Sequence, residues 1–295
     1  MQRLQYYLVI SLAKILMLLP KSLRRGLFKS LAYLTYLLYK KNRIIIERNL
    51  RYIYHDKISS SEIKKIAKSC YEKLFLTVLS IIENEHLTSG QIESMVQFEG
   101  KNYIDDLKKQ NKQFIYITAH LGNLDVLGVI IGHFFGKTTH VQQRLKNPLL
   151  SEYMQKQREK YGIKVIDKYG AMKGLFMALK KGEIVSLVID QATNLKYTSK
   201  VKFLGKDEYQ LNTSSTLSKR FKLPILPVFI VGGDDDYKVI FKKPIYPDDK
   251  TIQELDQIQA DVISDMILKY PNEWFWCHKR FKHSDPSLYD PTSTN

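Results

Sequence analysis

A histidine and an aspartate stand five positions apart where a short apolar run ends. The stretch "IYITAHLGNLDVLG" (115–128) places His120 in a polar turn and Asp125 at the start of an amphipathic segment. Across a turn, the acid can accept a hydrogen bond from one imidazole nitrogen and leave the other as a general base. The backbone N–H groups of Gly122 and Asn123 suit an anion or a developing oxyanion. The residues alone leave two interpretations equally open, a catalytic dyad and a satisfied core histidine.

The elements that would position this pair begin with the apolar run itself. From residue 113 onward, strand-like runs alternate with helical periodicity, which is typical of an α/β sheet. The expected strands are 113–118, 139–143, 162–166, 183–189, 199–204, 224–231 and 237–241, and the expected helices are 148–161, 171–181, 213–222 and 251–269. We therefore expect a single mixed-sheet α/β domain over residues 96–282, with helices on both faces and functional groups at strand ends.

The N-terminal part of the chain is both basic and apolar. Residues 1–50 carry ten Lys and Arg against one acid, yet the stretches 4–20 and 27–39 are strongly apolar. Apolar helices flanked by basic residues are typical of membrane-surface or single-span anchors. A span needs about 20 apolar residues, and Lys14 interrupts the first stretch, so a pair of buried core helices is the alternative. We expect residues 1–95 to form a helical membrane-anchoring region.

Composition narrows the partners and the chemistry. The formal charge of +16 points to an anionic partner: nucleic acid, a phospholipid surface or an acidic protein. Nucleic acid ranks last, because basic arms that bind it are rarely so apolar. The two cysteines, Cys70 and Cys277, form neither a disulfide framework nor a metal motif. No metal or cofactor is expected, and the polar segment 283–295 is expected to be a flexible tail.

Five stretches, taken in order, resemble the late acyltransferases of lipid A biosynthesis, the lauroyl/myristoyl transferase family. "AHLGNLD" is similar to the H-x4-D/E signature of the wider glycerolipid acyltransferase superfamily, with Asp125 where the family usually has Glu. The other four are "RIIIERNLRYIY" (43–54), "QQRLKNPLLSEYMQKQREKYGIKVI" (142–166), "GEIVSLVIDQATN" (182–194) and "YPNEWFWCHKRFK" (270–282). The last is the most specific. In the second, "QQR" replaces the family's usual aromatic residue before the arginine.

The resemblance implies an O-acyltransferase of the bacterial inner membrane, with its catalytic domain on the cytoplasmic face. The donor would be a fatty acyl thioester on acyl carrier protein, which is acidic. The acceptor would be a hydroxyl on the hydroxyacyl chain of a phosphorylated, Kdo-bearing lipid A precursor. His120 would act as general base and Asp125 would orient it. The positive charge would then serve anionic membrane lipids, the acceptor phosphates and the carrier protein.

The other site residues expected from these stretches are less specific. Arg144 is the best candidate for holding a phosphate of acceptor or donor, because Arg can bind phosphate bidentately. The remaining candidates for substrate binding are Lys146, Arg158, Gly122, Asn123, Asp190 and Gln191. Each also has a structural interpretation: a solvated basic face, a fixed turn, or a cap at a strand end. Trp274, Trp276, His278, Lys279 and Arg280 would form either packing or an interfacial cluster, with packing favoured for the tryptophans.

Two other functions compete with this interpretation. The nearest is an acyltransferase that acts on a glycerol phosphate lipid or on another phospholipid or glycolipid. The other is a membrane-surface protein that keeps the fold without the activity. The presence of both His120 and Asp125 argues against this second function. An acyl-transfer assay separates them, because the first would transfer an acyl chain to another lipid and the second would transfer none.

Overall fold

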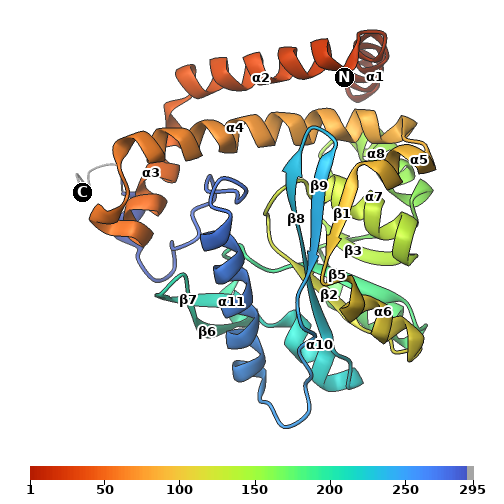
Figure 1. The fold of residues 1–295 in the computed structure, drawn as a ribbon, viewed down its shortest axis with the longest axis vertical. Coiled ribbons are helices and arrows are strands. Elements are labelled where there is room, and N and C mark those ends of the chain that lie inside the picture. The colour runs from red at the N-terminus through yellow and green to blue at the C-terminus, as the bar shows by residue number, and fades with distance from the viewer. Residues whose placement is uncertain (291–295) are drawn as a thin grey trace.

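Seven strands form one mixed sheet in the order β1-β9-β8-β2-β5-β3-β4 in this computed structural model, which describes residues 1–290 (Figure 1). The strands are β1 (Val96–Glu99), β2 (Ile115–Thr118), β3 (Thr138–Gln142), β4 (Ile163–Asp167), β5 (Ile184–Val188), β6 (Thr198–Phe203), β7 (Lys206–Leu211), β8 (Ile225–Gly233) and β9 (Asp236–Phe241). Only β8 and β9 pair antiparallel within the sheet, and β6 and β7 form a separate hairpin. β2, β5, β3 and β4 run parallel, so their carboxyl ends meet at one edge.

Helices cover both faces of this sheet. They are α1 (Gln2–Met17), α2 (Lys21–Leu38), α3 (Lys40–Tyr54), α4 (Ser60–Glu83), α5 (Ser89–Ser94), α6 (Lys101–Lys109), α7 (Leu124–Phe135), α8 (Pro148–Lys160), α9 (Ala171–Lys180), α10 (Thr213–Phe221) and α11 (Ile252–Lys269). Side chains of β2 alternate between two buried cores. Ile115 and Ile117 join the core that holds α9, α10 and α11, whereas Tyr116 joins the core that holds α6 and α7.

The α/β prediction with a mixed sheet is confirmed, and each predicted strand and helix of this part lies within two residues of its observed bounds. β1, β7 and α6 were not predicted. β1 is a four-residue strand that alternates between half-buried and exposed residues, and it is too short to give a clear period. The parallel β2 is buried at all four positions, and such a continuous apolar run is easier to detect.

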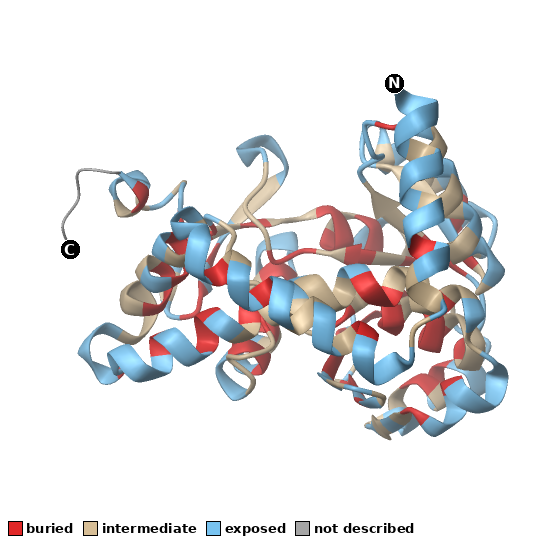
Figure 2. Ribbon diagram, turned by 90° about the horizontal axis from the view of Figure 1, so that it is seen from above, coloured by how far each residue is buried: buried red, intermediate tan, exposed pale blue. Residues whose placement is uncertain are grey.

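The N-terminal helices divide into an exposed pair and a packed pair. α3 and α4 contribute Leu50 and Ile66 to the core of the sheet, and α2 lies along the outer side of α4 (Figure 1). α1 buries only Ala13 and exposes Leu8 by 58% and Ile15 by 60%. Figure 2, viewed from above, shows the exposed surface along this helix near the N-terminus. The alternative of two buried core helices is therefore wrong.

Among residues 1–290, no helix is both long enough and apolar enough to cross a bilayer. Lys14 interrupts the apolar sequence of α1, and Pro20 stands at the start of α2. α2 exposes a row of leucines on the side away from α4. These are Leu23, Leu27, Leu31, Leu34, Leu37 and Leu38. The sequence allowed either a membrane-surface anchor or a single membrane-spanning helix, and none of the described helices meets the requirement for a span.

The segment expected to be a flexible tail begins with packed residues. Pro286–Tyr289 forms one turn of 3-10 helix, and Tyr289 is buried. Its hydroxyl donates a hydrogen bond of 2.5 Å to Oδ1 of Asn49 on α3. His283 and Ser284 thus contact β7 and Tyr289 contacts α3, and residues 291–295 of the expected tail lie outside the described residues.

Candidate active site

Strand register brings His120 beside an acid that lies 70 positions further along the chain. β2 and β5 are parallel neighbours, with Thr118 opposite Val188. Two residues beyond each paired end stand His120 and Asp190, both at the carboxyl edge of the sheet. Side chains that leave parallel strands at equivalent positions point into the same space. His120 Nδ1 lies 2.8 Å from Asp190 Oδ1.

The Asp190 carboxylate is fully engaged. Its Oδ1 accepts from His120, and its Oδ2 accepts a 2.7 Å hydrogen bond from Nε1 of Trp274. The side chain of Asp190 is 1% exposed, whereas that of His120 is 35% exposed. Because Nδ1 faces the acid, Nε2 is the nitrogen through which His120 can exchange a proton with a bound substrate.

Burial and pairing act against each other on both groups. Burial lowers the pKa of His120, but the Asp190 carboxylate raises it by more, so the pKa lies above its usual value. Burial raises the pKa of Asp190, but His120 and the Trp274 N–H lower it, and the net shift is downward. The carboxylate therefore stays ionised and stabilises the protonated imidazole, as the acid of a hydrolase triad does.

Asp125, predicted to orient His120, does not do so in this structure. Its Oδ1 accepts from Arg158 Nη2 at 2.6 Å and from Arg158 Nε at 3.1 Å. Asp125 lies in the first turn of α7, which directs it toward α8 rather than back across the turn. The prediction of a His120–Asp125 dyad is wrong about the acid. The same region contains an acid that serves the histidine, but it comes from β5.

A second histidine, His140, lies near both the His120–Asp190 pair and the Asp125–Arg158 pair. Burial lowers the pKa of His140 to about 4, with Arg158 and His120 acting in the same direction and Asp125 opposing them. These four groups are therefore electrostatic neighbours. His140 Nδ1 lies 3.0 Å from the hydroxyl of Ser186 on β5. It stays neutral at ordinary pH, so it adds no charge beside His120.

The turn after His120 is built by contacts rather than left open for an anion. Gly122 has a φ of +69°, and a Cβ there would meet the carbonyl oxygen of Ile230 at 2.1 Å. The N–H of Gly122 donates to the carbonyl of Glu273 at 2.9 Å, so the predicted anion contact through this group is wrong. Asn123 caps α7 by accepting from the N–H of Val126. Its structural interpretation, a fixed turn, is the one observed.

The basic residues that were expected to bind substrate differ in exposure. Arg144 is 71% exposed and lies 3.2 Å from Asp167; Lys146 is exposed on the same loop. Arg158 is 16% exposed. Arg144 and Arg158 line one small depression at the ends of β3 and β4. Gln191 follows Asp190 directly and is half-buried. The structure thus gathers these residues at the edge that carries His120.

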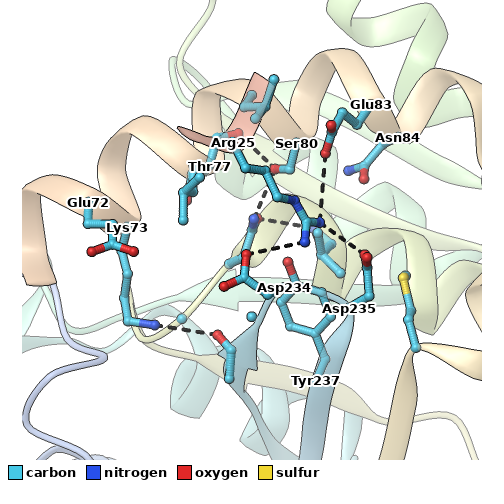
Figure 3. A pocket seen from close by; sticks show the side chains of 18 of the residues that line it. Arg25, Glu72, Lys73, Thr77, Ser80, Glu83, Asn84, Asp234, Asp235 and Tyr237 are labelled. Carbon is cyan, nitrogen blue, oxygen red and sulfur yellow. Dashed lines mark hydrogen bonds and ion pairs between the residues drawn. The ribbon is translucent and has the colours of Figure 1, made fainter. Parts of the chain in front are cut away.

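A larger cavity of about 250 Å³ lies behind this turn. Gly122 and Asn123 line it, together with α2, α4 and the turn between β8 and β9. Figure 3 shows Arg25 directed at Glu83, Asp234 and Asp235 there. His120 does not line this cavity. The ion pairs of Arg25 with Asp234 and Asp235 connect α2 to the turn between β8 and β9.

The family to which the chain belongs follows from its sequence. The family described as bacterial lipid A biosynthesis acyltransferase matches residues 1–283. The chain belongs to this family. Its mixed α/β sheet is accordingly an acyltransferase fold.

Two relatives and one solved structure are similar to this acyltransferase. Over 258 residues the chain is 22% identical to the lipid A biosynthesis palmitoleoyltransferase of Escherichia coli K12, covering 85% of this chain and 83% of that protein. Over 260 residues it is 20% identical to the lipid A biosynthesis acyltransferase of Haemophilus influenzae, covering 85% and 80%. The crystal structure of the 1-acyl-sn-glycerophosphate acyltransferase PlsC from Thermotoga maritima aligns with a TM-score of 0.43 and 15% identity, covering 85% of this chain and 98% of that one.

The C-terminal segment of this acyltransferase is packing, as favoured for its tryptophans. Trp274, Trp276 and Arg280 are buried, and only Lys279 of the five residues is exposed. The link from Trp274 to Asp190 was not predicted, because nothing in the local sequence connects positions 84 apart. Equal distance beyond two adjacent strands is the one signal that could have paired Asp190 with His120.

Proposed function

We propose that the chain transfers a fatty acyl group from acyl carrier protein to a hydroxyl on the hydroxyacyl chain of a Kdo-bearing lipid A precursor. The observation that carries this proposal is the 2.8 Å contact between His120 Nδ1 and the buried Asp190. Family membership supplies the class of reaction. The pair supplies the base that such a reaction needs.

Each proton in the proposed reaction has a place. His120 Nε2 takes the proton of the acceptor hydroxyl as its oxygen attacks the thioester carbonyl. The carbon–sulfur bond then breaks, and the protonated imidazole returns the proton to the leaving thiolate. Asp190 keeps Nδ1 protonated and stabilises the charged ring between these steps. A base of this kind contributes roughly 10²–10⁴ in rate.

Basic residues at the same edge of the sheet could bind the acceptor phosphates. Arg158 is nearly buried and held in one geometry by Asp125, so its remaining N–H groups are pre-oriented for an anion. Arg144 and Lys146 lie at the exposed end of this loop region. We assign phosphate binding first to Arg158 and second to Arg144. Asp125 acts by positioning Arg158.

The protein would work at the cytoplasmic face of the bacterial inner membrane, with α1 and α2 lying on the bilayer surface. Both helices expose leucines on one side, and Lys or Arg residues flank them. Such helices bind anionic lipid by apolar burial and by charge. The acidic carrier protein would be attracted by the same positive charge of the chain.

The deciding experiment follows an acceptor by mass. Detergent-solubilised protein is mixed with an acyl-carrier-protein thioester and a lipid A precursor that bears its inner-core sugars. A mass gain of one acyl chain is expected with the wild type and is lost with His120→Ala, while omission of the acceptor gives the background. A set of thioesters of different length then reports the preferred chain.

The other outcomes are equally specific. Transfer to a glycerol phosphate lipid, and none to the lipid A precursor, would replace the proposed acceptor. Transfer that survives His120→Ala would remove His120 as the base. No transfer to any acceptor, from protein that is folded and bound to membrane, would overturn the proposed activity.

A further inference from the structure

We propose that Trp274 is a positioning residue that fixes the Asp190 carboxylate in the orientation that reaches His120. The inference rests on the proposed role of His120 as general base. It adds a residue from the C-terminal segment to a site otherwise built from strand ends. The indole N–H of Trp274 is the group that contacts Asp190.

The two hydrogen bonds to Asp190 define one rotation of its carboxylate. Oδ2 accepts from Trp274 Nε1 at 2.7 Å, and Oδ1 is thereby aimed at His120 Nδ1, 2.8 Å away. Terminal carboxylate torsions are broad when nothing holds them. With Asp190 1% exposed, water cannot replace a lost donor easily. Without the indole N–H, Oδ2 would seek another partner and the contact with His120 would loosen.

Trp274 is itself tied to the turn that carries His120. The N–H of Phe275 donates to the carbonyl of His120 at 2.9 Å, and Leu121 forms an isolated antiparallel bridge with Trp274. The carbonyl of Glu273 accepts from Gly122. Residues 273–275 therefore run alongside residues 120–122. One short antiparallel backbone contact therefore holds the residues that carry the indole and the imidazole side by side.

A buried frame holds this segment from behind. The Trp274 ring meets the Trp276 ring edge-on, with centroids 4.6 Å apart. Asn49 of α3 donates to the carbonyls of Trp276 and His278 at 2.8 and 2.9 Å. The segment is thus rigid on the side away from Asp190, as a residue that sets an orientation requires.

The test compares two tryptophans that differ in one respect. Trp274→Phe and Trp276→Phe each remove one buried indole N–H and the same ring area, from side chains that are 2% and 0% exposed. The N–H of Trp274 reaches Asp190, whereas that of Trp276 reaches the carbonyl of Pro271 at 2.7 Å. Trp276→Phe is therefore the matched control. Incorporating 3-benzothienylalanine at position 274 keeps the bicyclic shape and removes only the N–H.

Two readouts separate positioning from packing. We expect Trp274→Phe and the benzothienyl variant to lower kcat by about 10–100-fold with KM within about twofold. The pKa of His120, followed by NMR of ring-labelled histidines and assigned with His120→Ala, should fall in both variants. Trp276→Phe should leave that pKa unchanged and keep kcat within about threefold, whatever its loss of thermal stability.

The inference fails if the benzothienyl variant titrates like the wild type and keeps its kcat. It also fails if Trp274→Phe and Trp276→Phe change kcat and the His120 pKa equally. The NMR titration needs no turnover. Loss of the proposed acyl transfer in the wild type would therefore leave the positioning of His120 by Trp274 separately measurable.

Discussion

Two carboxylates flank the turn after β2, and they hold different cations in different surroundings. Asp190 is 1% exposed, bonds His120 with one oxygen and accepts from Trp274 with the other. Asp125 is 19% exposed and bonds Arg158. The buried pair contains an imidazole, a group able to exchange a proton, whereas the other pair contains a guanidinium, a group suited to holding anions. The comparison separates the proposed site for proton transfer from the proposed site for anion binding.

The largest effect should come from Asp190→Asn, which keeps the shape and removes the charge. An amide can hold the wrong imidazole tautomer, so we expect kcat to fall by about 10³–10⁴, as for a triad that loses its acid. Asp190 raises the pKa of His120. Its removal lowers that pKa, and the acidic limb of the residual rate profile should move to lower pH. Steady-state rates from pH 5 to 9 measure both effects.

Asp125→Asn is the matched control for that variant. It removes a carboxylate from the same turn without touching Nδ1 of His120. Equal losses of kcat in the two variants, with equally displaced acidic limbs, would contradict the division between the pairs.

These pairs also mark what could be predicted from sequence. The apolar run before His120 and the strand–helix alternation are local signals, so the strands and the position of the histidine followed from them. The identity of its acid did not, because the contact between His120 and Asp190 depends on which strands are neighbours and in what register. Spacing suggested Asp125, whose side chain the first turn of α7 directs toward Arg158. The resemblance to the acyltransferase family assigned Asp125 to His120 and placed Asp190 among the substrate-binding candidates, without a partner.

The N-terminal region shows the same limit. Its amphipathic composition predicted helices correctly, and those helices are α1 to α4. Which of them pack on the sheet is decided by tertiary contacts such as that of Asn49 with the C-terminal segment. Asn49 lies in a basic stretch with no feature of a core residue, yet it is fully buried. Burial of a polar side chain needs partners that only the fold supplies.

The next effect concerns the turn that both pairs share. Gly122→Ala places a methyl group against the Ile230 carbonyl at a φ of +69°, so we expect the free energy of unfolding to fall by about 2–5 kcal/mol. Chemical denaturation measures this loss. Gly170→Ala has a similar φ of +76° with no atom within 4 Å of the added carbon, and it should cost only about 1 kcal/mol. Equal costs would mean that the close approach to Ile230 contributes nothing.

The anion-binding side should respond more weakly and in a different parameter. Arg158→Gln leaves His120 and Asp190 in place, so KM for a phosphorylated acceptor should rise by about tenfold while kcat changes little. Asp125→Ala should show a similar rise, because Arg158 then loses the carboxylate oxygen that accepts from both its Nε and its Nη2. The double variant should be no worse than either single variant, since both remove one interaction. Additive losses in KM would separate the two residues and refute the positioning role of Asp125.

Substitution of Arg144 should have the smallest effect. It tests whether the exposure of an arginine side chain indicates how much that residue contributes to binding the acceptor. Arg144 resembles Arg158 in charge and in lining the same depression, but it is 71% exposed and meets Asp167 through Nε at 3.2 Å. Exposed pairs contribute little because solvent screens them and the side chain loses entropy on ordering. We expect Arg144→Gln to raise KM by about threefold at low ionic strength, and this difference should vanish at about 0.5 M salt because the Debye length shortens. The effect of Arg158→Gln should persist at that salt concentration. If salt removed both effects equally, burial of Arg158 would not distinguish it from Arg144, and the anion would bind at the surface instead of beside His120.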